Sequence, residues 1–260
     1  MIEPLLLSTT RVSTFRETSI LTAASGFFFH RGDALFLATS RHVVFDQAAG
    51  HLPDRIEFVL HTDAQDLTRV TAISIRLYDD QGGAVWRQGT DSGGEVDVAV
   101  IELDRSVFPA SAVFRSFGPE HLQHAFDTVE VGAPVLLPGF PLGFYDTLHH
   151  LPVVRQAVIA SSFGVRFQGL GYFITDARTH RGSSGAPVVM RDDGVQPQLP
   201  WRLLGVHSAR MDMGTRDRIE DESLGLNCAW YADILLALTA PHPGRGSAAD
   251  GAGGPRGPSS

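Results

Sequence analysis

The chain has 260 residues, of which 43% are hydrophobic and 19% charged, and its formal net charge is −8. This length and apolar content suffice for a hydrophobic core in one two-lobed domain or two small domains. The acidic balance argues against a nucleic-acid partner, which needs a basic surface for phosphates. The single cysteine, Cys228, excludes an intramolecular disulfide, so we expect it to be a small buried apolar residue.

The first residues of the chain do not resemble a targeting signal. Residues 1–13 lack a basic segment and a small-residue cleavage site, which a secretory signal would contain. No run approaches 18 consecutive apolar residues, so no membrane-spanning helix is expected. We therefore expect a soluble cytoplasmic protein with no membrane partner.

Short apolar runs separated by turn residues follow the N-terminal segment. Residues 24–30 and 35–39 flank Arg31-Gly32-Asp33, a pattern typical of a β-hairpin. Apolar and polar residues alternate in the next segments, which indicates half-buried strands. The strands expected in this half lie at 24–30, 35–39, 56–60, 73–77 and 97–103.

The second half repeats this pattern, with strands expected at 134–138, 152–161, 171–176, 186–190 and 203–207. Many short strands without crossover helices indicate an all-β sandwich or barrel. A short helix is expected at 231–239 and a helical link at 119–126, and the charged residues 211–222 are expected to form an exposed loop. From residue 241 the chain has almost nothing to bury, which predicts a disordered tail over 241–260 and leaves no room for a further C-terminal domain.

The most informative motif is Gly182-Ser183-Ser184-Gly185-Ala186-Pro187. Glycines beside a serine let the backbone curl so that two N–H groups and one hydroxyl converge, which is the geometry for attacking a carbonyl and holding the oxyanion. A turn serine in a glycine-rich loop would give the same pattern, so this motif alone does not decide the matter.

Two upstream segments supply a candidate base and acid for the candidate nucleophile Ser184. His42 follows an apolar strand, and Asp97 opens a strongly apolar strand where a buried carboxylate needs a donor such as an imidazole N–H. A neutral serine hydroxyl requires such a base, and the base requires an acid to fix its tautomer. Because His, Asp and Ser occur in a known order for this triad, we predict a serine protease.

The other carboxylates nearby, Asp91, Glu95 and Asp104, have polar surroundings in the sequence. They are interpreted as solvated.

These segments resemble the chymotrypsin-like serine proteases, especially the bacterial trypsin-like and HtrA-type branch. The likeness covers roughly residues 20–237 and is carried by residues 37–44, 97–100, 138–143 and 174–187. It implies two six-stranded antiparallel β-barrels with a short C-terminal helix. His42 and Asp97 would lie in a first lobe over 1–118 and Ser184 in a second lobe over 119–240.

The resemblance also implies the parts of the reaction. The backbone N–H groups of Gly182 and Ser184 would form the oxyanion hole, and a polypeptide would be hydrolysed through an acyl-enzyme without a cofactor. Ala186 replaces a usual glycine of the family, a change expected to be tolerated. Ser183 replaces the aspartate that pairs with a freed N-terminus in digestive members, so zymogen cleavage of that type is not expected.

Three residues are candidates for substrate specificity. Thr179 and His207 resemble the pair that glutamyl-specific bacterial members use to hold an acidic side chain, and Arg178 would add a positive charge. A hydroxyl and an imidazole can both donate to a carboxylate. In the alternative interpretation, Thr179 and His207 bond to the pocket wall and Arg178 points to solvent.

Other functions remain open at this stage. A catalytically silent trypsin-like fold could serve as a protein-binding or scaffold module with the same residues. An α/β-hydrolase esterase needs its acid and histidine after the serine, where only His207 and His242 occur. His149 and His150 are adjacent, but neighbouring strand residues face opposite sides and no third ligand is suitably spaced, so no metal site is expected.

Overall fold

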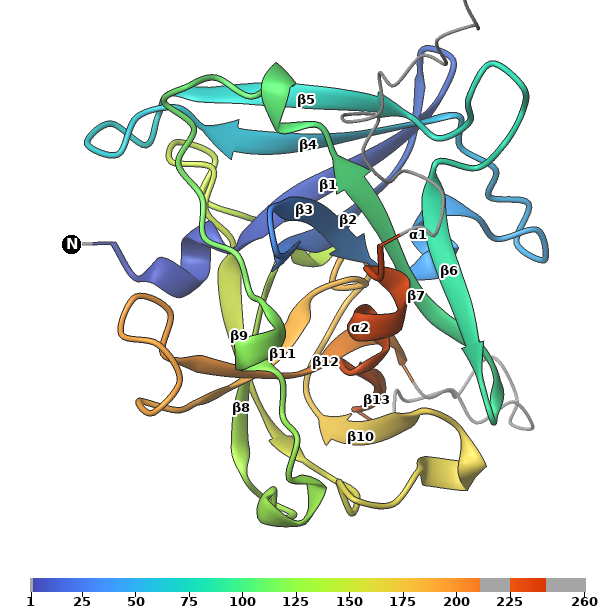
Figure 1. Cartoon of the computed structure of the whole chain (residues 1–260), viewed down its shortest axis with the longest axis vertical. Helices are drawn as coiled ribbons and strands as arrows, with labels where there is room; N and C mark the ends of the chain where they lie inside the picture. Colours follow the sequence, from blue (N-terminus) through green and yellow to red (C-terminus); the bar gives the residue numbers. More distant parts are fainter. Residues whose placement is uncertain (1, 211–224, 242–260) are drawn as a thin grey trace, which may run out of the picture.

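The protein is described by a computed structural model that covers residues 2–210 and 225–241 (Figure 1). The charged loop expected at 211–222 and all but the first residue of the tail expected at 241–260 lie outside the described residues. Within the described ranges, no helix is long and apolar enough to cross a membrane.

The first lobe is one antiparallel sheet of seven strands in the order β5-β4-β1-β2-β3-β7-β6. Its elements are η1 (Pro4–Leu7), β1 (Thr9–Arg16), β2 (Ser19–Arg31), β3 (Ala34–Thr39), α1 (Arg41–Val44), β4 (Arg55–His61), β5 (Val70–Arg76), β6 (Trp86–Asp91), β7 (Gly94–Leu103) and η2 (Arg105–Val107). The hairpin expected around Arg31-Gly32-Asp33 is confirmed, because β2 pairs with β3 across these residues. The patterns did not reveal β1 and β6.

The prediction of a closed six-stranded barrel in this lobe is corrected by the structure. The sheet has seven strands, and its edge strands β5 and β6 are not paired with each other. The edge strand β6 instead lies against the C-terminal end of the chain, where Arg87 Nη1 donates to Ala240 O at 2.9 Å. Because helix α2 and the residues after it occupy this side, the sheet edge is covered by packing rather than by barrel closure.

The second lobe is a closed antiparallel barrel in the order β10-β13-β12-β11-β8-β9, which confirms the six-stranded barrel expected there. Its elements, with the turns leading into it, are η3 (Pro119–His121), η4 (Phe126–Thr128), β8 (Pro134–Gly139), η5 (Pro141–Gly143), β9 (Val153–Ile159), η6 (Phe167–Gly169), β10 (Tyr172–Asp176), β11 (Pro187–Arg191), β12 (Trp201–Arg210), β13 (Leu226–Tyr231) and α2 (Ile234–Leu238).

The predicted helices are shorter in the structure than in the sequence pattern. The link expected at 119–126 forms two separate 3₁₀ turns, η3 and η4. The helix expected at 231–239 begins only at Ile234, because Tyr231 ends β13 and pairs with Gly205 of β12. A five-residue apolar helix is too short to be stable alone, so packing of buried Leu235 and Leu238 holds α2 in place.

Apolar packing joins the two lobes. Buried Phe27 and Phe29 of β2 belong to the same core cluster as Val206 of β12 and Trp230 of β13. Phe117, from the segment that links the lobes, packs edge-to-face on Phe27 with ring centroids 5.8 Å apart. Burial of this shared cluster fixes one lobe against the other. Figure 1 shows the strands of the two lobes packed beside each other.

An ion pair also crosses between the lobes and corrects one sequence prediction. From the sequence, Asp91 is interpreted as solvated, but its side chain is only 16% exposed. Its Oδ2 atom lies 2.5 Å from Arg166 Nη2. A Cβ atom at Gly171 would lie 2.0 Å from Asp91 Oδ2, so glycine is required for this approach. The tip of the β6–β7 hairpin is thereby held on the second barrel. Glu95 and Asp104, in contrast, are exposed.

We predict that Arg166→Ala lowers the free energy of unfolding by about 2 kcal/mol, because it leaves the mostly buried Asp91 carboxylate without its charged partner. Urea unfolding measures this loss. Arg76→Ala is the matched control, since its pair with Asp80 has side chains 74% and 85% exposed and should cost less than about 0.5 kcal/mol. Equal effects of the two variants would contradict the role given to the Arg166–Asp91 pair.

Candidate active site

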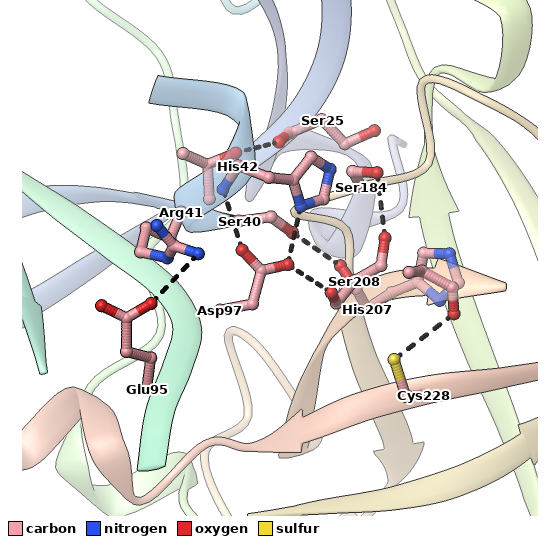
Figure 2. Close-up of polar contacts among 12 residues, drawn as sticks. Ser25, Ser40, Arg41, His42, Glu95, Asp97, Ser184, His207, Ser208 and Cys228 are labelled. Atoms are coloured by element: carbon pink, nitrogen blue, oxygen red, sulfur yellow. Dashed lines mark hydrogen bonds and ion pairs between the residues drawn. The ribbon is translucent and has the colours of Figure 1, made fainter. Parts of the chain in front are cut away.

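Asp97 and His42 lie together at the junction of the lobes (Figure 2). His42 Nδ1 lies 2.6 Å from Asp97 Oδ2, and the backbone N–H of His42 donates to Asp97 Oδ1 at 2.8 Å. Asp97 stands in β7 and His42 in the single turn of α1, which follows directly after β3. Because β3 and β7 are paired, with Thr39 opposite Ala99, the turn carries His42 over the start of β7.

A third side chain completes the surroundings of the carboxylate. Ser208 of β12, from the second lobe, donates its hydroxyl to the same Oδ2 atom that faces the imidazole. Burial alone would raise the pKa of Asp97, but the hydrogen bonds and charge of His42 and the bond from Ser208 outweigh burial and hold that pKa below its ordinary value. Asp97 is therefore an anion aimed at the imidazole of His42.

Ser184 lies in the loop before β11, and its hydroxyl is held by the second lobe. Ser184 Oγ donates to the backbone oxygen of Ser208 at 2.9 Å. Among residues 2–210 and 225–241, no hydrogen bond joins Ser184 to His42. Figure 2 draws both side chains beside the Ser208 strand, so attack on a carbonyl would require the hydroxyl to exchange the Ser208 oxygen for the imidazole.

The backbone around Ser184 presents two free donors. Within the described part of the chain, the N–H groups of Gly182 and Ser184 donate to no acceptor. The preceding carbonyls are both occupied: Arg181 O accepts from Leu142 N at 2.5 Å, and Ser183 O accepts from Ala186 N at 2.9 Å. Because a trans peptide points its N–H away from its C=O, these bonds fix the direction of both free donors.

Gly182 is required at its position for two reasons. Its φ is +93°, a conformation that residues with a Cβ atom rarely adopt. A Cβ there would also lie 2.4 Å from Phe140 O. The glycine therefore permits both the turn of the loop and its close contact with the residues that follow β8, and the resulting pair of N–H groups can hold a negatively charged oxygen.

The three predicted specificity residues differ in their surroundings. Thr179 is buried, and its hydroxyl lies 2.5 Å from Oδ1 of the buried Asn227. His207 is 2% exposed, and its ring Nδ1 is buried without a hydrogen-bond partner among the residues that the structure describes. The backbone of His207 bonds to Gly185 and Ala186, directly after Ser184, whereas the side chain of Arg178 is exposed.

Burial, together with a smaller contribution from the nearby His42, lowers the pKa of His207 to about 4. The imidazole of His207 is therefore neutral at pH 7. A neutral imidazole carries one N–H donor and one acceptor nitrogen, so it can still donate to a carboxylate.

Sequence reasoning missed the serines that connect this site. Ser208 bonds Asp97, Ser40 Oγ donates to His207 O at 3.1 Å, and Ser25 Oγ donates to Gly182 O at 2.8 Å. All three are at most 3% exposed. The available signal was a serine within or directly after an apolar run in each case, which is too common to identify a site.

The remaining candidates lie elsewhere. His149 pairs with Asp146 at 2.7 Å on a surface loop, and His150 has a φ of +56°. Over the ranges 2–210 and 225–241, no three His, Cys, Asp or Glu side chains are grouped so as to hold a metal ion. Cys228 is buried, as predicted, with its sulfur 3.4 Å from Ala209 O.

The two-lobed β architecture and the site at its junction define a chymotrypsin-like fold. The family model described as "Trypsin-like peptidase domain" matches residues 24–195, and the chain belongs to this family. A search of curated proteins found no relative.

Two solved structures share the fold. An HtrA-type protease, AlgW, with a tripeptide has a TM-score of 0.53 and 19% sequence identity, and the match covers 89% of this chain and 58% of that one. The serine endoprotease from Yersinia pestis has a TM-score of 0.50 and 17% identity, with 90% and 62% covered. The chain thus spans about three-fifths of the length of these two neighbours.

We predict that His207 makes stability depend on pH. Because burial depresses its folded-state pKa to about 4, the unfolded chain binds a proton at this residue between pH 6.5 and 4 while the folded chain does not. Stability is therefore full above pH 6.5 and falls by roughly 3 kcal/mol as the pH approaches 4. Urea unfolding of His207→Gln should show a correspondingly flatter dependence over this window, and an unchanged slope would contradict the assignment.

Proposed function

We propose that this protein is a serine endopeptidase in which Ser184 is the nucleophile, His42 the general base and Asp97 the acid that orients it. One observation carries the proposal: an anionic carboxylate bonded to the imidazole lies at the same lobe junction as a serine flanked by two backbone N–H groups without acceptors. An imidazole paired with an anion, close to a serine with two backbone donors, is the arrangement that nucleophilic catalysis by a serine requires.

The mechanism follows from these groups. His42 takes the proton of Ser184 while Oγ forms a bond to the substrate carbonyl carbon, and the N–H groups of Gly182 and Ser184 hold the resulting oxyanion. The C–N bond then breaks as His42 returns the proton to the leaving amine. Water, deprotonated by His42, attacks the acyl-enzyme and releases Ser184. Asp97 stabilises the imidazolium in both stages and needs no proton of its own.

We predict that Ser184→Ala, His42→Ala and Asp97→Asn each reduce kcat about 10⁴-fold, because each removes a member of one proton-transfer unit. Hydrolysis of casein and of fluorogenic peptides measures the loss. Full activity of purified Ser184→Ala would refute the assignment of the nucleophile.

The second candidate, a catalytically silent binding module, predicts a different result from the same protein. A fluorophosphonate probe should label the wild type and not Ser184→Ala if the site is active. A correctly folded wild type that neither reacts with the probe nor cleaves any peptide would support the scaffold function instead.

We further propose that substrates carry an acidic residue before the cleaved bond. The buried Nδ1 atom of His207 has no partner, and the backbone of His207 is bonded next to the nucleophile, which supports a donor aimed at a substrate carboxylate. Thr179 supplies a second buried polar group, and its hydroxyl lies 2.5 Å from Asn227 Oδ1. Exposed Arg178 would act through long-range charge.

We predict that a peptide library is cleaved mainly after Glu or Asp, and that His207→Gln lowers kcat/KM for these peptides about 100-fold relative to cleavage after Leu. Arg178→Ala should change the same ratio by less than about threefold, because its charge is screened by solvent. Cleavage after Leu, Val or Arg and none after Glu or Asp would eliminate the acidic preference. The cytoplasmic location and the absence of a nucleic-acid partner stay predictions.

A further inference from the structure

We infer that Ser25 is a positioning residue that holds the oxyanion-binding loop in its active arrangement from the opposite lobe. The inference rests on the proposed function and deepens it. Ser25 stands in β2 of the first lobe and is completely buried. Figure 2 shows it at the edge of the cluster that contains His42 and Ser184.

The polar groups of Ser25 bond the two residues whose N–H groups are free. Its backbone N–H donates to Ser184 O at 2.9 Å, and its hydroxyl donates to Gly182 O at 2.8 Å. Thus the carbonyl of each residue that supplies an oxyanion donor is held by the same first-lobe residue. Gly182 and Ser184 have no other bond of this kind to the first lobe among the residues described by the structure.

The hydroxyl of Ser25 is itself fixed in direction. Phe140 N donates to Ser25 Oγ at 3.0 Å, so the hydroxyl accepts one hydrogen bond and donates its single proton to Gly182 O. The backbone oxygen of Ser25 accepts from Thr39 Oγ1 at 2.8 Å. Every polar group of this buried residue therefore has at least one partner, and the two bonds of the hydroxyl determine its orientation.

The space around Ser25 is as restricted as its hydrogen bonds. A Cβ atom at Gly185 would lie 2.1 Å from Ser25 O, and one at Gly139 would lie 2.9 Å from Ser25 Oγ. The two glycines let the nucleophile loop and the end of β8 approach Ser25 closely. The loop thus touches the first lobe at a point where both its backbone and a side-chain hydroxyl are engaged.

The bond to Gly182 O matters because of its place between the two donors. The Gly182–Ser183 peptide lies between the peptides that carry the Gly182 and Ser184 N–H groups. Those outer peptides are held by bonds within the second lobe, from Leu142 and Ala186. Without the Ser25 hydroxyl, the carbonyl of the middle peptide loses its partner, and that peptide keeps the bond from its Ser183 N–H to His180 O, at 3.1 Å. Rotation of the peptide then changes ψ at Gly182 and φ at Ser183. The two donors would then no longer converge on one oxygen.

Ser25→Ala tests this inference, because it removes the hydroxyl and keeps the backbone bond to Ser184. With a peptide that the wild type cleaves, we expect kcat to fall 10- to 100-fold, while KM changes less than threefold. Affinity for a peptide boronic acid, which forms a tetrahedral adduct with Ser184, should fall by the same factor as kcat. Circular dichroism measures the folded fraction of the variant. If Ser25 only stabilises the fold, the folded fraction should bind the boronic acid with the affinity of the wild type.

Two further variants complete the experiment. Ser8→Ala is the matched control, since Ser8 is equally buried in the first lobe and its hydroxyl bonds only to Leu5 O, at 2.7 Å; kcat should stay within twofold of wild type. If Ser25→Ala does not fold, Ser25→Cys replaces it, because a thiol has a similar shape and forms only weak hydrogen bonds. We expect kcat and the boronic acid affinity of this variant to fall in parallel, by a smaller factor than in Ser25→Ala.

The outcomes separate the inference from the proposed function. An active wild type together with a Ser25 variant whose kcat and boronic acid affinity are within threefold of wild type overturns the positioning role alone. A folded wild type without activity and without fluorophosphonate labelling overturns the proposed function and, with it, the role of Ser25.

Discussion

The structure depends on one constraint, which is that the carboxylate buried between the two lobes must receive hydrogen bonds from both sides of the junction. The Asp97 carboxylate receives bonds from His42 of its own lobe and from Ser208 of the other. An anion at this depth would be strongly destabilising without these donors. The lobes are therefore held at the separation that the carboxylate needs, and the loop that carries Ser184 lies at the same junction.

The apolar core and the polar junction act together. The core cluster that contains Phe27, Phe117 and Trp230 excludes water from one side of the junction, and the Asp91–Arg166 pair fixes the hairpin that leads into Asp97. Hydrogen bonds in such surroundings are stronger and more directional than in water. This combination explains how a junction assembled from two separate sheets is held together in a chain with a single cysteine.

Sequence patterns predicted the second barrel better than the first lobe. Strands β8 to β12 follow apolar runs with clear turn residues, and each was expected within a few residues of its position. Strand β6, Trp86–Asp91, contains charged and polar residues, because one side of this edge strand faces α2 and the other is solvated. This strand pairs with the adjacent strand β7 and lies against the chain end, which is far away in sequence, so its burial is not visible in a local pattern.

The sequence by itself determined the chemistry of the site: a glycine-flanked serine, a histidine after an apolar strand and an aspartate opening another are read from local context. Only the tertiary structure decided which polar residues bond to this site. Ser25, Ser40 and Ser208 form their hydrogen bonds with partners 111 to 167 residues away. The tertiary structure also decided that Asp91 is paired and that the first sheet stays open. Hydrogen bonds between distant segments depend on how the two lobes pack, and this packing does not produce a periodic pattern in the sequence of either segment.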